Sequence, residues 1–107
     1  MTEADFHQLA DLKLSELEQC IEASQDEMGW VLDWEYHSGV LTIIVESNQS
    51  QIIISRQPSI AELWVAAKSG GYHFTYNGRQ WQDGDGITIE TCVGRAIEAQ
   101  SGIPINL

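Results

Sequence analysis

The sequence predicts an α+β protein, a two-layer sandwich in which a helix, a six-stranded antiparallel sheet and a second helix follow one another. Near each end of the chain, apolar residues recur every three or four positions, which is the period of a helix with one buried face. Between these segments, apolar and polar residues alternate, as in half-buried strands joined by short turns. Such strands pair as an antiparallel meander. We expect both helices to cover one face of the sheet and to leave the other face to solvent.

The first helix is predicted over residues 4–24, followed by a polar connection over residues 25–29. Its apolar positions fall within about 80° of arc at ~100° per residue. These positions are Phe6, Ala10, Leu14, Leu17 and Ile21. The second helix is predicted from Thr88, as N-cap, to Gln100, with Gly102 as its stop. Its expected core face is Ile89, Cys92, Val93, Ala96 and Ile97.

Six strands are predicted between the helices, over residues 30–36, 40–46, 51–56, 60–68, 72–76 and 80–82. The fourth also contains good helix formers, but its apolar residues alternate with Glu62 and Trp64, which favours a strand. Asn77 and Gly78 form a strong hairpin signal between the last two strands. We expect Trp30, Trp34 and Trp81 to lie in the core.

The length of 107 residues fits one domain, so residues 1–107 are predicted to fold as a unit. No apolar run approaches the ~20 residues of a membrane span. The acidic start, residues 1–5, differs from a signal or transit peptide, so we expect a cytoplasmic protein. Cys20 and Cys92 lack the spacing of a zinc site and are interpreted as buried thiols.

Charge is the strongest compositional signal, because sixteen acidic residues against five basic ones give a net charge of −11. Through Glu35 there are ten acidic residues and only Lys13 as a basic residue, so the first third carries −9 of this total. Such a chain repels nucleic-acid phosphate, which argues against DNA or RNA as a partner. It attracts cations or a basic protein surface instead.

Eight residues of the first third form a candidate cation site, which we call the acidic ridge. They are His7, Asp11, Glu18, Glu22, Asp26, Glu27, Asp33 and Glu35. The four on the predicted helix fall within about 60° of arc, and the last two share one face of the first strand. Carboxylate and imidazole groups suit iron and other divalent cations. From the residues alone, this surface is equally typical of a solvated face that keeps the domain soluble.

Trp64 and His73 lie, by strand alternation, on the sheet face opposite the helices. Large exposed aromatic residues often mark contact sites, although partial burial under a loop is an alternative. Arg56 and Lys68 are expected to flank them. The loop at residues 83–86 resembles half of a calcium loop, but it lacks the remaining ligands and is predicted to be a plain turn.

Five stretches of the sequence are informative together: residues 5–11 (DFHQLAD), 39–43 (GVLTI), 52–58 (IIISRQP), 63–68 (LWVAAK) and 70–74 (GGYHF). In this order they resemble the bacterial frataxins, and the resemblance covers nearly the whole chain. The resemblance implies the helix, six-stranded sheet and helix described above, and weak binding of Fe²⁺ and Fe³⁺ on an acidic surface of the first helix and first strand. It also implies docking to the cysteine desulfurase of iron–sulfur cluster assembly through the tryptophan at position 64, as an iron donor or iron-responsive regulator.

Residues 19 and 23–25 are neutral where relatives are often acidic, which argues against a high iron load per chain. Two other functions stay open. One is a ferroxidase with iron storage, but the chain lacks the Glu-x-x-His pairs of ferritin-like oxidases, so we do not expect an enzyme. The other is an acidic inhibitor of a basic protein that acts without metal. We expect a monomer that contacts the iron–sulfur scaffold machinery and no membrane, with iron-dependent oligomers as an open alternative.

Overall fold

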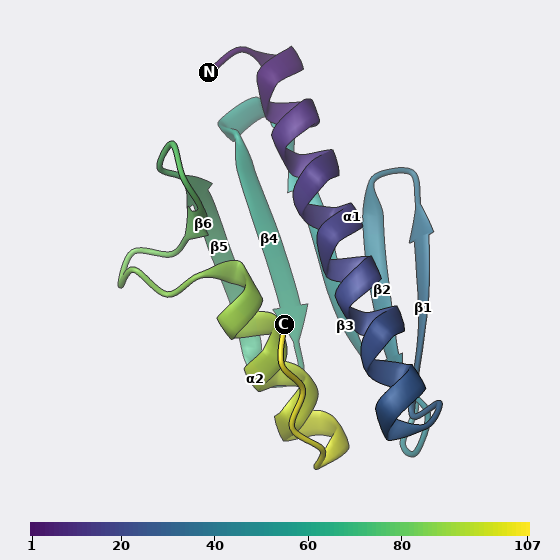
Figure 1. Ribbon diagram of the computed structural model, residues 1–107. Coiled ribbons are helices and arrows are strands. Elements are labelled where there is room, and N and C mark those ends of the chain that lie inside the picture. Colours follow the sequence, from purple (N-terminus) through teal and green to yellow (C-terminus); the bar gives the residue numbers. More distant parts are fainter.

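Two helices lie on one face of a six-stranded antiparallel sheet in the computed structural model, which describes all 107 residues (Figure 1). This confirms the predicted fold class. The elements are α1 (Glu3–Met28), β1 (Leu32–His37), β2 (Val40–Val45), β3 (Ser50–Gln57), the short 3₁₀ helix η1 (Pro58–Ile60), β4 (Glu62–Ala67), β5 (Gly70–Tyr76), β6 (Trp81–Gln82) and α2 (Ile89–Ser101). Neither helix is both long and apolar enough to cross a membrane.

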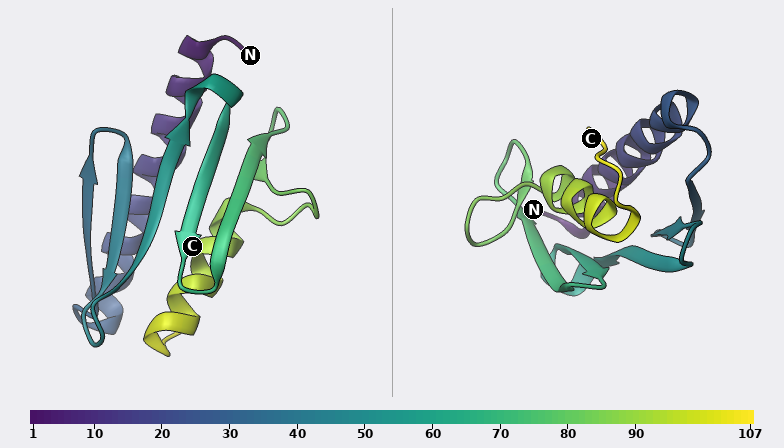
Figure 2. Two further views of the ribbon diagram at one scale, coloured as in Figure 1. Left: turned by 180° about the vertical axis from the view of Figure 1, so that it is seen from behind. Right: turned by 90° about the horizontal axis from the view of Figure 1, so that it is seen from below.

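The strands are arranged in the order in which they follow along the chain, from β1 at one edge to β6 at the other. Every neighbouring pair is antiparallel, as the short turns predict. Seen from behind, the sheet face opposite the helices carries no covering element (Figure 2, left). The fold therefore offers two places for function, an open sheet face and a free edge at β1.

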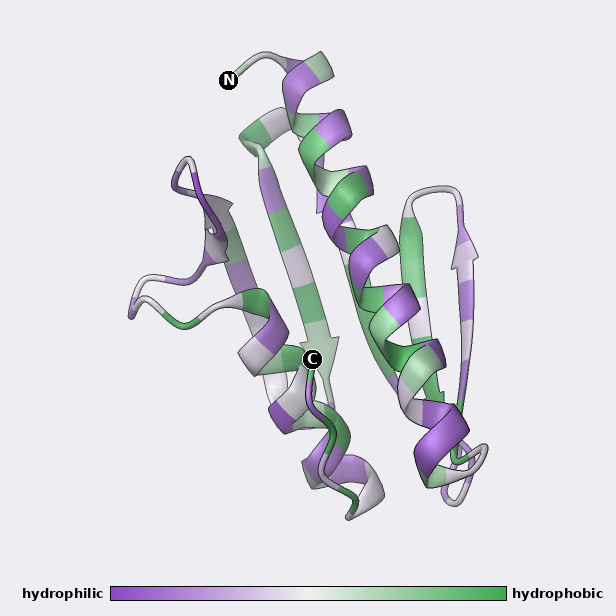
Figure 3. Ribbon diagram, in the orientation of Figure 1, coloured by the Kyte–Doolittle hydropathy of each residue, from purple (hydrophilic) through white to green (hydrophobic).

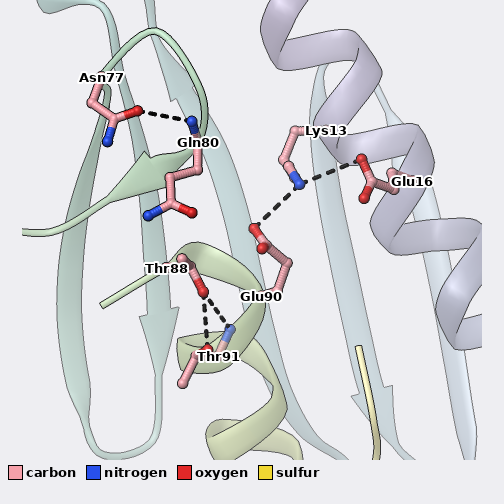
Figure 4. A network of polar contacts seen from close by, with 7 residues as sticks. All are labelled: Lys13, Glu16, Asn77, Gln80, Thr88, Glu90 and Thr91. Carbon is pink, nitrogen blue, oxygen red and sulfur yellow. Dashed lines mark hydrogen bonds and ion pairs between the residues drawn. The ribbon is translucent and has the colours of Figure 1, made fainter. Parts of the chain in front are cut away.

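The core lies in a single layer between the helices and the sheet and contains 20 buried apolar residues. All five apolar positions predicted for the first helix and all five for the second are buried. Phe6 from α1 meets Trp81 from β6 edge to face, with ring centroids 5.8 Å apart. Lys13 joins the helices, because its ammonium lies 3.4 Å from Glu16 on α1 and 3.2 Å from Glu90 on α2 (Figure 4).

Helix α1 runs one turn beyond its predicted end, and Gln25 is the reason. Its side chain is 1% exposed, and its Oε1 accepts hydrogen bonds from the backbone N–H groups of Val31 and Leu32, both at 2.9 Å. Gln25 thus belongs to the buried face of the helix, and the polar connection predicted at residues 25–29 is wrong. Asp26 and Glu27 consequently lie in the last turn of α1.

The tryptophans are not all buried or exposed as predicted. Trp81 is buried as expected, and Trp34 is half-buried against the core. Trp30 is 66% exposed, so its placement in the core is wrong. The strand begins only at Leu32, and therefore the alternation that places Trp34 on the inner face does not extend back to Trp30.

We predict that Gln25→Ala lowers the free energy of unfolding by about 1–3 kcal/mol, because the backbone N–H of buried Leu32 loses its acceptor and that of Val31 keeps only the Gly29 carbonyl. Urea unfolding followed by circular dichroism measures the change. Gln19→Ala is the matched control, since Gln19 is exposed on the same helix and contacts only Ser15. Equal stability of the two variants contradicts this account of the end of α1.

Candidate functional site

The six carboxylates between residues 18 and 35 have no basic partner. No Lys or Arg occurs between Lys13 and Arg56, and none of the five ion pairs in the structure involves these six side chains. We call them the open carboxylates: Glu18, Glu22, Asp26, Glu27, Asp33 and Glu35. They are six members of the acidic ridge, and each is free to attract a cation.

The other two ridge residues, His7 and Asp11, contact Arg56 instead. The Arg56 guanidinium donates to the Asp11 carboxylate, and through Nη2 to the Tyr36 hydroxyl at 2.7 Å. Its Nη1 lies 3.1 Å from Nδ1 of His7. A guanidinium can only donate, so His7 must accept at Nδ1 and carry its proton on Nε2, which faces Glu3 at 3.7 Å.

This cluster corrects two predictions. Arg56 pairs in register with buried Leu63 and lies on the helix side of the sheet, so it does not flank Trp64 on the open face. Asp11 is neutralised by Arg56 and lies about 10 Å along the helix from Glu18, at 1.5 Å per residue. His7 and Asp11 therefore do not act with Glu18 and Glu22 as ligands of one ion.

A glycine lies against the Arg56 cluster. Gly39, in the turn between β1 and β2, has φ +77°, and a Cβ built there lies 3.0 Å from Nε of Arg56. A side chain at this position would strain the turn and crowd the guanidinium. The turn thus helps to hold Arg56 against α1.

The negative potential is concentrated at the C-terminal end of α1. Asp26 and Glu27 lie in its last turn, where no basic residue is present and the helix dipole is itself negative. This end of the helix is strongly hydrophilic (Figure 3). Carboxylates at a negative helix end repel the dipole as well as one another, and a bound cation relieves both.

Asp33 and Glu35 lie on β1, which is the sheet edge that the prediction required. Their neighbours in sequence, Leu32 and Trp34, face the core, so by alternation these two carboxylates point to the open face. Asp33 also accepts a hydrogen bond from the backbone N–H of Trp34 at 2.9 Å. The open carboxylates thus pass from α1 around the edge of the sheet.

Nowhere do three or more His, Cys, Asp or Glu side chains come close enough to hold a metal ion in the conformation described. Most of the open carboxylates are exposed, and only Glu18 is half-buried. The surface can attract cations electrostatically and coordinate them through one or two carboxylates plus water. Such an arrangement favours weak binding with little selectivity among divalent cations.

Trp64 and His73 stack on the open face, with ring centroids 4.4 Å apart and an interplanar angle of 6°. Both orientations are as predicted, since their neighbours Leu63 and Phe74 are buried. Glu62 holds this pair: its Oε1 accepts from the Trp64 indole at 2.8 Å and lies 3.8 Å from His73 Nδ1. The sequence analysis missed Glu62, although its position two residues before Trp64 places it on the same face.

Lys68 lies in the turn after β4, and its backbone N–H donates to Gln100. It is exposed, and four residues along an extended strand correspond to about 13 Å between its backbone and that of Trp64. That the Lys68 side chain flanks the tryptophan stays a prediction. The neighbours of Trp64 across the strands are Ser55 and His73.

Two further sequence features are structural. Burial first, and then the nearby Asp83 carboxylate, raises the pKa of the Cys92 thiol, which keeps it protonated and unreactive at neutral pH. In the loop at residues 83–86, Asp83 accepts hydrogen bonds from the backbone of Asp85 and Ile87, both at 2.9 Å. This side chain stabilises a turn, as predicted.

Comparisons with known proteins agree with this architecture. A family model described as a frataxin-like domain matches residues 1–102. The iron–sulfur cluster assembly protein CyaY of Pseudomonas aeruginosa is 43% identical over 105 residues, covering 95% of this chain and 93% of that protein. CyaY of Verminephrobacter eiseniae is 36% identical and covers 98% and 96%, respectively. The solved frataxin of Psychromonas ingrahamii superposes with a TM-score of 0.81 at 33% identity, covering 99% of this chain and 97% of that one.

The open carboxylates should destabilise the fold in the absence of metal. We predict that Glu18→Gln with Glu22→Gln raises the free energy of unfolding by about 0.5 kcal/mol, because it removes a like-charge pair one helical turn apart. Thermal unfolding at low ionic strength measures the gain in stability. This gain should shrink in about 1 M salt, because the Debye length falls to ~3 Å.

Asp11→Asn is the control with the opposite sign, since it leaves the mostly buried Arg56 guanidinium without its anion. It should lower stability by about 1–3 kcal/mol. A stability loss in the Glu18/Glu22 variant as well would show that these two carboxylates make stabilising contacts.

Proposed function

Since this chain belongs to the frataxin-like family, whose relatives are named as iron–sulfur cluster assembly proteins, we propose that it serves iron–sulfur cluster assembly as an iron-binding adapter and regulator without catalytic turnover. The observation that carries this proposal is the run of six open carboxylates on α1 and β1, which no basic side chain neutralises. The place of action is the cytoplasm.

Iron is the cargo of the open carboxylates. Fe²⁺ and Fe³⁺ are held weakly, by a few carboxylate oxygens and water, and other divalent cations compete. The dipole of α1 and its terminal Asp26 and Glu27 make the end of this helix the strongest attractor. Weak, exposed binding suits a protein that passes iron on or reports its concentration.

The open sheet face is the docking surface for the cysteine desulfurase and its scaffold machinery. Trp64 supports this assignment, because its ring is fixed by Glu62 and His73 and is only partly covered. A rigid aromatic side chain contributes much to binding and loses little entropy on docking. The acidic surface beside it adds electrostatic attraction to a basic partner.

A titration with Fe²⁺ under anaerobic conditions, or with Co²⁺, tests the iron site. We predict that backbone amide NMR signals of residues 18–35 change first, since the open carboxylates lie there. The loop at residues 83–86 supplies the internal control. Changes that begin in this loop contradict the assignment, and the absence of any saturable change favours an acidic inhibitor that acts without metal. Oxidation of Fe²⁺ in air at substoichiometric protein would instead identify a ferroxidase.

Substitution of Trp64 tests the docking surface. We predict that Trp64→Ala leaves the fold intact and weakens binding to the desulfurase at least about thirtyfold, the effect of a central aromatic anchor of ~2 kcal/mol. Isothermal titration calorimetry measures the affinity, and the metal titration of the same variant should be unchanged. Unfolding of the variant, or full desulfurase affinity, refutes this role of Trp64.

A further inference from the structure

Two tryptophans form an exposed stack beside the free edge of the sheet. The rings of Trp30 and Trp34 lie 6.0 Å apart with an interplanar angle of 15°, and Trp34 rests against the core. Trp30 is the most exposed large apolar side chain of the chain at 66%. A stack of this kind is rigid on its inner side and offers the outer indole face to a partner.

The outer indole borders a groove that has its own charge. The groove has a volume of about 350 Å³ and lies between the β1–β2 end of the sheet and the chain that follows α2. Trp30, Val31, Val45 and Ile103 form its apolar wall, and Glu46 stands beside them. Glu46 is exposed and takes part in no ion pair.

This combination fits a cationic side chain with an apolar stem. An indole face attracts a guanidinium or ammonium group, most strongly for tryptophan. The apolar wall can cover the methylene groups of such a side chain, while the free carboxylate of Glu46 pairs with its charge. A guanidinium matches better than an ammonium, because it is planar and stacks on aromatic rings.

We propose that this groove is an interaction site for an arginine side chain in a basic segment of a partner protein. The net charge of −11 favours a basic partner and opposes both a second copy of this chain and an anionic membrane surface. The groove does not involve Trp64 or its neighbours. It therefore supplies a second anchor that acts independently of the open sheet face. Only the identity of the partner, a protein of iron–sulfur cluster assembly, rests on the proposed function.

The test uses a short acetylated and amidated peptide with two arginines, together with matched peptides that carry lysine or uncharged citrulline. Titrations are followed by the indole N–H signals of the four tryptophans, in the presence of a chelator so that metal plays no part. We expect the Trp30 indole and the Glu46 and Ile103 amides to shift together, with affinity falling from arginine to lysine to citrulline.

Two variants locate the contact. Trp30→Ala should weaken the arginine peptide about two- to fivefold, the range of an exposed cation–π contact. Glu46→Gln should have a similar effect, and Trp64→Ala should have none. Unchanged affinity in Trp30→Ala, equal binding of citrulline, or shifts confined to the open carboxylates would each overturn the proposal. So would a dimer in sedimentation that Trp30→Ala abolishes.

The desulfurase supplies the last comparison. If the wild-type protein binds it and Trp30→Ala binds several-fold more weakly, the groove is an anchor for that partner. If the wild-type protein and Trp30→Ala bind the desulfurase equally, docking through the open sheet face stands. The desulfurase then does not occupy the groove, which overturns the assignment of the groove to this partner. If neither binds, the proposed docking fails, while the peptide titration still decides whether the groove takes arginine.

Discussion

Burial of two helix faces against one side of a thin sheet is the constraint on which the rest of this structure depends. With 107 residues, the chain forms one apolar layer, in which Phe6 and Trp81 connect the start of α1 to the last strand. No element remains to cover the second sheet face or the edge at β1. The single-sided core therefore determines where function can reside, because every partner must use the surfaces that the core leaves open.

The few basic residues determine which acidic residues are left without a basic partner. Arg56 crosses from the sheet to neutralise Asp11, and Lys13 lies between Glu16 and Glu90. Both contacts tie α1 to the rest of the fold, so these cations are structural. The carboxylates beyond their reach have no basic partner, and this makes the end of α1 and the strand β1 attractive to cations.

The functional surfaces differ in how their side chains are held. Trp64 is fixed by a hydrogen bond to Glu62 and by stacking on His73, whereas Trp30 stacks on Trp34 and is largely exposed. The open carboxylates depend on exposed side chains without fixed geometry. A rigid anchor and a diffuse charged surface suit different tasks, the first specific docking and the second weak capture of ions.

The sequence by itself determined the order of the elements, the buried faces of both helices and the orientation of Trp64, because these follow from local periodicity and from side chains that must avoid water. Only the tertiary structure decided which charges meet. Arg56 lies on the same strand face as buried Ile52 and Ile54, and there Asp11, 45 positions away in the sequence, pairs with its charge. Gln25 looked like a polar linker residue, and only the approach of the Val31 and Leu32 backbone explains its burial. Contacts between side chains far apart in the sequence depend on how distant elements pack. No local sequence pattern predicts which of these residues will lie close together.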